Sequence, residues 1–397
     1  MTQGRRENWA NGLLTRLFPP IYALIYALYF ALRLFNSDGI LDSQGRMLGS
    51  DFTMFWLASN FVLEGDIGAV YDWDRVASAQ RELFGYERGL YAWSYPPIFL
   101  IYVLPLALLP YAWAYVAWCV ATFAALAAVV RKIAPARETL WLLLGFPATL
   151  VNGVHGQNGF LTAALFGGAL SLINRRPILA GVLFGLLTYK PQFGVLIPIA
   201  LIAGRCWTAF AAAAVTTVVL LGVSAAGFGV EPWVAFWHNI PELYQAVLEG
   251  RPALINVPSL MITLHLLGVD DGVAQGFHIA LALAVAAVVA WVWYRRGATI
   301  ASAAVLATGA FFVPPHPYGY DLALLAVPIA LIGWTAYRDG LLWAEREVLV
   351  LAWLMPILVW ISVAVIGVQI GTACLLAVFA ICVRRALAAG GAHDAPL

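Results

Sequence analysis

Apolar segments interrupted by short polar turns run along most of the chain, and this pattern predicts helices that cross a membrane. The segments continue for about 15–25 residues, without the alternation over about 10 residues that marks a strand of an outer-membrane barrel. The expected fold is therefore all-α, a polytopic bundle of about twelve spans that forms a single integral membrane domain over residues 1–397. The expected spans are 17–35, 111–130, 138–152, 157–173, 177–189, 190–204, 206–228, 275–294, 299–313, 320–337, 346–366 and 370–386.

Some expected spans, such as 177–189, are shorter than the ~20 residues of a full crossing. Short or broken helices at membrane depth are tolerated where they line a cavity of the protein. A further apolar segment, 96–110, does not fit the parity of the crossings, and we expect it to be re-entrant or oblique. Four prolines divide it: Pro96, Pro97, Pro105 and Pro110.

Two longer polar stretches, 36–95 and 229–274, separate the apolar segments. The first carries nine acidic residues against four arginines, a net charge of −5. Because short cytoplasmic loops are rich in Lys and Arg, we expect 36–95 to be a long extra-cytoplasmic loop and 229–274 a second extra-cytoplasmic region with an interfacial helix. The basic clusters that fix this orientation are Arg131 with Lys132 and Arg137, Arg175 with Arg176, Arg205, Arg295 with Arg296, Arg338 with Arg346, and Arg384 with Arg385.

Composition narrows the class of protein. Hydrophobic residues make up 62% of the chain and charged residues 11%, with a mean hydropathy of +0.84, whereas a soluble domain holds about 25% charged residues. The net charge of +1 gives no sign of a nucleic-acid partner, and the expected surroundings are membrane lipids. The four cysteines show neither pairing nor metal-ligand spacing, so no metal is expected. Arg5, Arg6 and Arg16 precede a first span that we expect to remain uncleaved.

Four polar motifs are expected at the same extra-cytoplasmic face. They are Asp51, residues 155–158 (His-Gly-Gln-Asn), residues 189–192 (Tyr-Lys-Pro-Gln) and residues 314–321, which hold His316. Polar residues at membrane depth are costly and usually functional, so their convergence on one side is more informative than any one of them.

Asp51 lies among aromatic residues, which suits a general base that acts on a hydroxyl. Alternatively, Ser50 or Asp51 caps a helix over 52–63. Lys190 suits a lipid-linked phosphate or diphosphate, and its alternative is a lysine that extends to the membrane interface. The neighbouring Tyr189 and Gln192 favour the functional interpretation.

His316 stands in a proline-rich turn with Tyr318, Tyr320 and Asp321. It would orient a leaving phosphate, act as an acid, or only fix the turn.

His155 precedes Gly156, which allows a close backbone approach, and Gln157 and Asn158, whose amides bind hydroxyl groups. A turn between two helices would also favour Gly and Asn, but we weigh this motif toward substrate binding.

The aromatic residues of the first polar stretch would stack on sugar rings or form an interfacial belt, and for most of them we favour the belt. They are Trp56, Tyr71, Trp73, Trp93 and Tyr95.

These motifs together resemble the polytopic glycosyltransferase family 87, within the GT-C superfamily. That family includes the mycobacterial polyprenol-phosphate-mannose-dependent mannosyltransferases of phosphatidylinositol mannoside synthesis. The resemblance covers most of the chain. It rests on Ser50-Asp51-Phe52 with Trp56, Glu64-Gly65-Asp66, Val70-Tyr71-Asp72, Tyr95-Pro96-Pro97, Pro105-Leu106-Ala107, Gly156-Gln157-Asn158, Ala180-Gly181, Lys190-Pro191 and Arg205-Cys206-Trp207.

The resemblance implies a GT-C-type fold and inverting transfer of a sugar, such as mannose or another hexose, from a polyprenyl-phosphate donor to a lipid or glycan acceptor. It implies an enzyme of the bacterial inner membrane, active at the extra-cytoplasmic face, with 36–95 as the catalytic loop and no cofactor. The first-loop aspartate would be the base. A histidine close to the donor is also implied, and His316 is the candidate by position. Together with the motifs above, the expected site residues are Asp51 and His316 for catalysis, Lys190, Tyr189 and His316 for the donor phosphate, and His155, Gln157, Asn158, Tyr318, Tyr320 and Asp321 for substrate.

Two other functions remain open on the residues alone. A secondary transporter or lipid flippase would also have about twelve spans, but such proteins commonly contain two related halves, and the long first polar stretch has no counterpart later in the chain. A non-catalytic membrane assembly subunit would leave Asp51, Lys190 and His316 as separate structural residues. We favour the glycosyltransferase.

Overall fold

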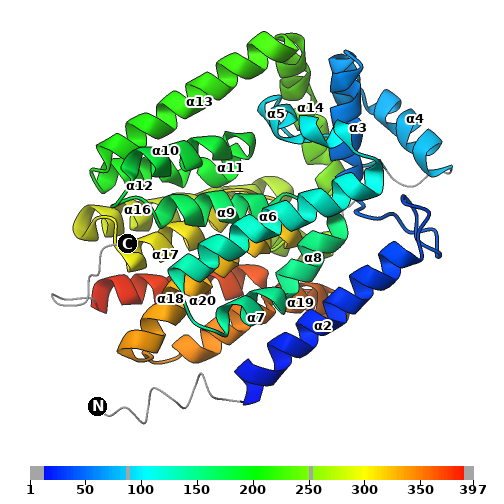
Figure 1. Ribbon diagram of the computed structural model, residues 1–397. Coiled ribbons are helices and arrows are strands. Elements are labelled where there is room, and N and C mark those ends of the chain that lie inside the picture. Colours follow the sequence, from blue (N-terminus) through cyan, green and yellow to red (C-terminus); the bar gives the residue numbers. More distant parts are fainter. Residues whose placement is uncertain (1–12, 86–89, 250–253, 389–397) are drawn as a thin grey trace.

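Helices make up most of the computed structural model, which describes residues 13–85, 90–249 and 254–388 (Figure 1). In this part of the chain, 7 helices are long and apolar enough to cross a membrane. Each coincides with an expected span, so the all-α fold is confirmed. They are α2 (Leu13–Phe35), α6 (Tyr111–Ile133), α13 (Trp207–Phe228), α16 (Asp271–Arg296), the 3-10 helix η7 (Gly319–Leu325) together with α18 (Ala326–Asp339), α19 (Glu345–Ile366) and α20 (Gly371–Ala388).

The remaining expected spans are shorter helices, so twelve full crossings are not confirmed. The expected span 138–152 is divided at Gly145, because Pro147 begins a new helix. Pro177 and Pro191 likewise begin short helices. The short elements are α5 (Ile98–Val103) and η3 (Leu104–Leu108) in 96–110, then α7 (Thr139–Leu144), α8 (Pro147–His155), α9 (Gly159–Leu170), α10 (Pro177–Gly185), η4 (Leu186–Tyr189), α11 (Pro191–Gly194), α12 (Leu196–Ala203), α17 (Ile300–Gly309) and η6 (Ala310–Phe312).

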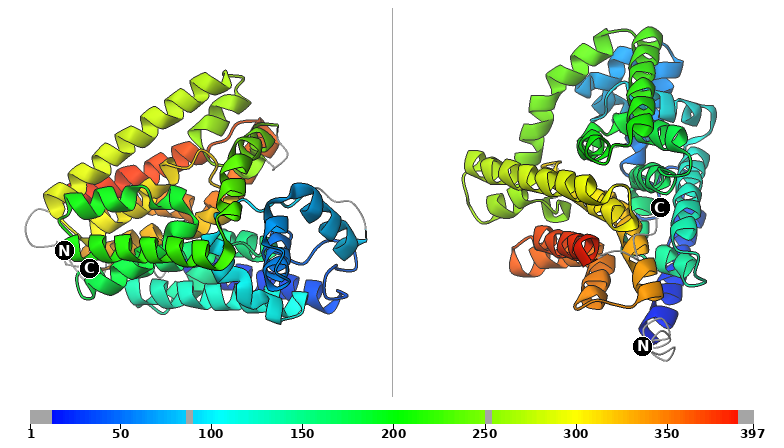
Figure 2. Two further views of the ribbon diagram at one scale, coloured as in Figure 1. Left: turned by 90° about the horizontal axis from the view of Figure 1, so that it is seen from above. Right: turned by 90° about the vertical axis from the view of Figure 1, so that its left-hand side faces the viewer.

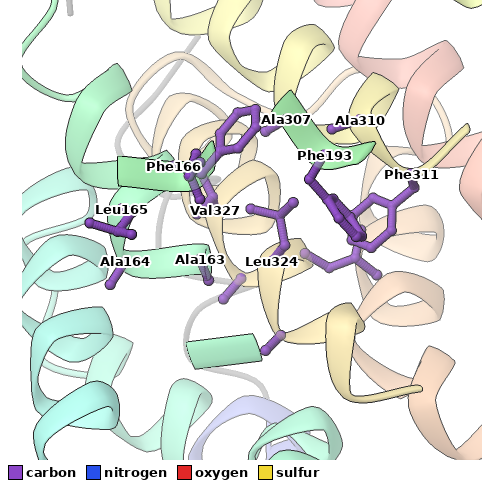
Figure 3. Close-up of a cluster of buried hydrophobic side chains, with 14 of the residues drawn as sticks. Ala163, Ala164, Leu165, Phe166, Phe193, Ala307, Ala310, Phe311, Leu324 and Val327 are labelled. Carbon is purple, nitrogen blue, oxygen red and sulfur yellow. The ribbon is translucent and has the colours of Figure 1, made fainter. Parts of the chain in front are cut away.

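The short helix α9 lies at the centre of the hydrophobic core, in contact with α6, α10 and η7. All of its residues except Leu161 are buried. Figure 3 shows Phe166 of α9 beside Val327 of α18, and Phe193 of α11 against Phe311 of η6, with the last two rings edge to face at 5.8 Å. A helix enclosed by protein on all sides has no need to span the bilayer, which explains why α9 is short.

The expected polar loop 36–95 contains three helices among its described residues. The apolar positions of its first helix pack into the core: Phe52 and Phe55 are fully buried, and the Phe52 ring meets the rings of Tyr111 and Tyr115 at 5.5 and 5.6 Å. The expected long first loop is therefore not confirmed. The elements of this stretch are α3 (Phe52–Leu63), η2 (Ile67–Tyr71) and α4 (Trp73–Phe84).

The second polar stretch, 229–274, returns to the first. Figure 1 and the right-hand view of Figure 2 show α14 at the same end of the molecule as α3 and α4. The Asn239 side chain of α14 donates a hydrogen bond to the Tyr71 carbonyl at 2.9 Å. The two stretches thus lie on the same side of the molecule. The elements of 229–274 are α14 (Glu231–Leu248), η5 (Leu254–Asn256) and α15 (Leu260–Leu266).

Candidate active site

A tight turn at the end of α2 places Asp51. Arg33 of α2 donates hydrogen bonds to the Asp42 carboxylate at 3.0 Å and to the Met47 carbonyl at 2.6 Å. Burial by itself would raise the pKa of Asp42, but hydrogen bonds from the backbone and side chain of Arg46, together with the Arg33 charge, lower that pKa to about 2. The turn is therefore held by a carboxylate that stays ionised down to acidic pH.

Gly49 carries the chain from this turn into α3. Its φ of +67° is a left-handed conformation, and a Cβ at this position would lie 2.6 Å from the Tyr115 ring. The Tyr111 hydroxyl donates to the Leu48 carbonyl at 2.7 Å. Only glycine fits this close approach, so the residue that precedes Ser50 and Asp51 fixes where α3 begins.

Asp51 stands at the N-cap position of α3, but its side chain makes no capping hydrogen bond. The helix over 52–63 is thus confirmed, whereas the capping role of Asp51 is wrong. Instead, one Asp51 oxygen accepts a hydrogen bond from the Gln157 amide at 3.1 Å, and the other lies 3.5 Å from His155 Nδ1. The Asp51 side chain is 19% exposed, so its carboxylate is oriented by protein and still accessible.

His155 forms a second contact with the same segment. Its Nδ1 lies 2.9 Å from the Ser50 hydroxyl, which is 3.2 Å from the Asp51 carboxylate. Burial lowers the pKa of His155, but the hydrogen bond and charge of Asp51 outweigh it and raise that pKa above its ordinary value. Asp51 thus stabilises the imidazolium form of His155 relative to the neutral form.

The turn over residues 155–158 joins α8 to α9 and places both amides. Gly156 ends α8 with a φ of +65°, and a Cβ there would lie 2.6 Å from Phe52 Cβ. The Gln157 side-chain oxygen accepts from the Tyr95 hydroxyl at 3.0 Å and from the Asn158 backbone N–H at 3.1 Å. These two donors orient the amide so that its nitrogen faces Asp51. The segment is thus both a turn between helices and a holder of polar groups.

Lys190 lies inside the protein, so the alternative of a lysine that extends to the interface is wrong. Its side chain is 4% exposed, and its Nζ donates to Asn158 Oδ1 at 2.9 Å and to the Asp321 carboxylate. The rings of Phe193 and Tyr320 face the ammonium at 5.4 and 5.3 Å. The expected isolated cation is in fact half of a buried ion pair.

The four expected motifs meet in one continuous polar network. Gln157 contacts Asp51, the adjacent Asn158 contacts Lys190, and Lys190 contacts Asp321. The other Asp321 oxygen accepts from the Tyr318 backbone N–H at 3.0 Å. Segments separated by more than a hundred residues are thus brought within hydrogen-bond distance.

Tyr318 and Tyr320 form the aromatic wall of this network. Their rings stack with centroids 5.4 Å apart, and the Tyr320 ring lies 6.5 Å from that of His155. Tyr320 therefore lies between the His155 end and the Lys190 end of the network.

Two expected site residues make other contacts. The Tyr189 hydroxyl is paired with Thr162 at 2.7 Å, and its fully buried ring stacks on Phe99 at 4.7 Å, so Tyr189 serves the core. The His316 ring packs edge to face on Tyr244 of α14 at 5.5 Å. Burial, with a contribution from His278, lowers the pKa of His316 to about 4. His316 is therefore neutral at physiological pH.

Three residues assigned to the interfacial belt are also core residues. Tyr71, Trp93 and Tyr95 are each no more than 5% exposed, and the Tyr71 hydroxyl and the Trp93 indole both donate to the Tyr95 carbonyl, at 2.9 and 2.7 Å. The belt prediction is wrong for these three, because the 36–95 stretch folds inward and covers its own aromatic side chains.

Sequence reasoning missed the roles of Ser50, Tyr95 and Asn152. Asn152 ties the 155–158 turn together, donating to the Gln157 carbonyl at 3.0 Å and accepting from the Gly159 N–H at 2.8 Å. Only the position of Tyr95 before two prolines carried a signal. Within the described ranges, no group of three or more His, Cys, Asp or Glu residues is placed to hold a metal ion.

Comparison with known proteins gives one match. The profile of Glycosyltransferase family 87 matches residues 93–315, more than half of the chain. No curated protein and no solved structure matches. The matched region includes the 155–158 turn and Lys190, whereas Asp51 and Asp321 lie on either side of it.

Proposed function

The chain belongs to glycosyltransferase family 87 and is a membrane glycosyltransferase, and on that premise we propose the reaction that it catalyses. It transfers a sugar, a hexose such as mannose, from a polyprenyl-phosphate donor to a hydroxyl of a lipid or glycan acceptor. The anomeric carbon is inverted and no cofactor takes part. The reaction occurs at the extra-cytoplasmic face of the bacterial inner membrane, the side that the positive-inside rule gives to Asp51.

The position of the Asp51 carboxylate is the observation that carries the proposal. It stands at a helix start without capping the helix, is oriented by Gln157, and remains 19% exposed. A carboxylate in this state can take the proton of an acceptor hydroxyl. The hydroxyl oxygen then forms the new bond to the anomeric carbon, and the bond from that carbon to the phosphate oxygen breaks.

The leaving phosphate receives the electron pair of the broken bond and needs hydrogen-bond donors. Lys190 has three N–H groups, and Asn158 and Asp321 accept two of them. The buried Asn158 Nδ2 has no partner among the described residues. We assign the donor phosphate to these remaining donors of Lys190 and Asn158, with Asp321 holding the ammonium in place.

The order of the network suits an inverting displacement, in which nucleophile and leaving group lie on opposite sides of the sugar. Gln157 contacts the proposed base, and the adjacent Asn158 contacts the proposed phosphate ligand. The sugar would lie between them, against the Tyr320 ring. Tyr318 completes this wall. The buried Nε2 of His316 has no hydrogen-bond partner in the part of the chain that the structure describes, and His316 would contact the donor from the side of α14.

The test is sugar transfer from a radiolabelled polyprenyl-phosphate-sugar by the purified protein in detergent. Asp51→Asn keeps the shape and the contact with Gln157 but removes the base, and we expect a loss of at least ~100-fold in rate. Asp74→Asn, on the exposed face of α4, is the matched control and should transfer normally.

Equal transfer by wild type and Asp51→Asn would retain the reaction and exclude Asp51 as the base. Absence of transfer by wild type with several polyprenyl-phosphate-sugars would contradict the donor assignment. Unfolding of Asp51→Asn, seen as a lower melting temperature than that of Asp74→Asn, would make the residue structural.

A further inference from the structure

A large apolar cavity lies away from the polar network. Its volume is about 520 Å³, within the ~300–1,000 Å³ of typical ligand pockets. It is enclosed by α2, α6, α7, α18 and α19, which meet at the lower end of the molecule in Figure 1. Aromatic side chains form much of its wall: Phe18, Tyr22, Phe146, Trp334 and Trp353.

The cavity and the polar network lie at opposite ends of α6. Tyr111, at the start of α6, donates to the backbone beside Asp51, whereas Val130, near its end, lines the cavity. At a rise of 1.5 Å per residue, these two residues are about 28 Å apart along the helix, nearly the thickness of the hydrocarbon core. The cavity end also carries Arg131 and Lys132, so the positive-inside rule places it in the cytoplasmic leaflet.

The cavity reaches the outer surface of the protein. Phe18 and Val350 line it, and they are 44% and 51% exposed. On a membrane-spanning surface, such an opening faces lipid. An apolar cavity does not retain water, so the ligand that suits this wall is a hydrocarbon chain that enters from the bilayer.

The lining contains two charged residues, Glu138 and Arg346. They form no ion pair with each other, and within the described part of the chain no hydrogen bond or ion pair involves either side chain. Arg346 is exposed and Glu138 half-buried. One cation and one anion at the same cavity match a headgroup that carries a phosphate and an ammonium group.

We propose that this cavity is a binding site for an aminophospholipid of the cytoplasmic leaflet, such as phosphatidylethanolamine. One acyl chain fills the space between α18 and α19, Arg346 binds the phosphate, and Glu138 binds the ammonium. The lipid ties α2 and α7 to α18 and α19. The site is separate from the proposed reaction and does not depend on it.

Gly333 of α18 allows the chain-binding part to be tested. It lines the cavity, and a Cβ added there meets nothing within 4 Å, so Gly333→Leu has room at its first side-chain atom and is expected to occupy part of the cavity. Gly222 of α13 also has open space around its added Cβ and does not line the cavity, which makes Gly222→Leu the matched control. The measurement is the melting temperature of delipidated protein with added phosphatidylethanolamine or phosphatidylglycerol in detergent.

We expect phosphatidylethanolamine to raise the melting temperature of wild type and Gly222→Leu by a few degrees, and by more than phosphatidylglycerol does. Gly333→Leu should lose this shift. An equal shift in Gly333→Leu, or no lipid-dependent shift in wild type, would overturn the site. A shift produced by polyprenyl phosphate but not by phosphatidylethanolamine would also overturn it.

The headgroup is tested by charge. Glu138→Gln should bind both lipids alike, because it loses the contact with the ammonium. Arg346→Gln should reduce the shift in melting temperature that each of the two lipids produces. Glu347→Gln, at an exposed position next to Arg346 that does not line the cavity, is the control and should behave as wild type. A preference for phosphatidylethanolamine that survives Glu138→Gln would contradict the assigned headgroup.

Discussion

Two buried ion pairs in this protein have the same charges and different surroundings. Lys190 and Asp321 are 4% and 3% exposed, and Arg385 and Glu345 are 10% and 0% exposed. The Arg385 guanidinium donates to both Glu345 oxygens at 2.6 Å and also to the Gly340 carbonyl. That pair is bidentate and joins the α18–α19 connection to α20.

The Lys190–Asp321 pair is less complete. Among the described residues, the lysine has a third N–H without an acceptor and the buried amide nitrogen of its neighbour Asn158 has no partner. The network continues to the partly exposed Asp51. We call Arg385–Glu345, with its bidentate hydrogen bonds, the closed pair, and we expect it to stabilise the fold. We call Lys190–Asp321 the open pair, because a pair with spare donors beside an accessible carboxylate is arranged to bind a ligand. The two pairs should therefore respond differently to mutation.

The largest expected effect is on stability, at the closed pair. Arg385→Leu leaves the Glu345 carboxylate buried without its bidentate partner, and loss of one partner of such a pair costs about 3–5 kcal/mol. We expect a large fall in melting temperature with normal transfer per folded molecule. Arg384→Leu, which removes a more exposed arginine 3.6 Å from Glu345, is the control and should lower the melting temperature less. Lost transfer at unchanged stability would contradict this assignment.

The next effect is on activity, at the open pair. Lys190→Met with Asp321→Leu removes both charges together, so no buried charge remains unpaired and the stability change should be small. Transfer should fall by about 100-fold or more, because the leaving phosphate loses its cation. Single-turnover transfer and the melting temperature are measured on the same samples. A double variant that keeps normal transfer would show that the pair is only structural.

The two histidines sharpen the comparison through pH. The pKa of His155 is raised by Asp51, so its stabilising effect is complete below the ordinary value of 6.5 and is lost as pH rises through the raised value. The pKa of His316 is lowered to about 4, so stability is lost as pH falls from 6.5 toward about 4, on the order of 3 kcal/mol.

We therefore expect His155→Gln to flatten the alkaline side of the profile of melting temperature against pH, and His316→Gln to flatten its acidic side. The same effect on one side from both variants would refute the separate environments of these residues.

The smallest effect is at Tyr95, a positioning residue that acts on Asp51 through Gln157. Tyr95→Phe removes one of the two donors that orient the Gln157 amide, and loss of one such hydrogen bond, about 1 kcal/mol, predicts a rate about five-fold lower at unchanged KM. Tyr102→Phe is the control. It likewise removes a tyrosine hydroxyl, in this case one that donates to the Leu186 backbone carbonyl, and it should leave the rate unchanged. Equal rates in both variants would argue against the positioning role.

The site was partly predictable from sequence. Asp51, Gln157, Asn158, Lys190 and Asp321 stand out because a polar residue in an apolar chain is costly, and that cost is visible in one dimension. Their partners are not visible, because the Asp321 that neutralises Lys190 is 131 residues away. The same limit applies to Tyr189: its sequence neighbour Lys190 enters the network, whereas the Tyr189 hydroxyl contacts Thr162.

The sequence by itself determined the class of the protein. Long apolar runs are costly to expose to water, so they specify helices in a membrane. The balance of basic residues between loops indicates the orientation of these helices. Only the tertiary structure decided which apolar segments form helices long enough to cross and which are short and enclosed by protein. The short helix α9 and the aromatic face of α3 are as apolar as a span, and they are buried by neighbours that lie far away in the chain. Hydropathy measures the transfer from water and does not distinguish lipid from a protein core, so the distinction depends on packing.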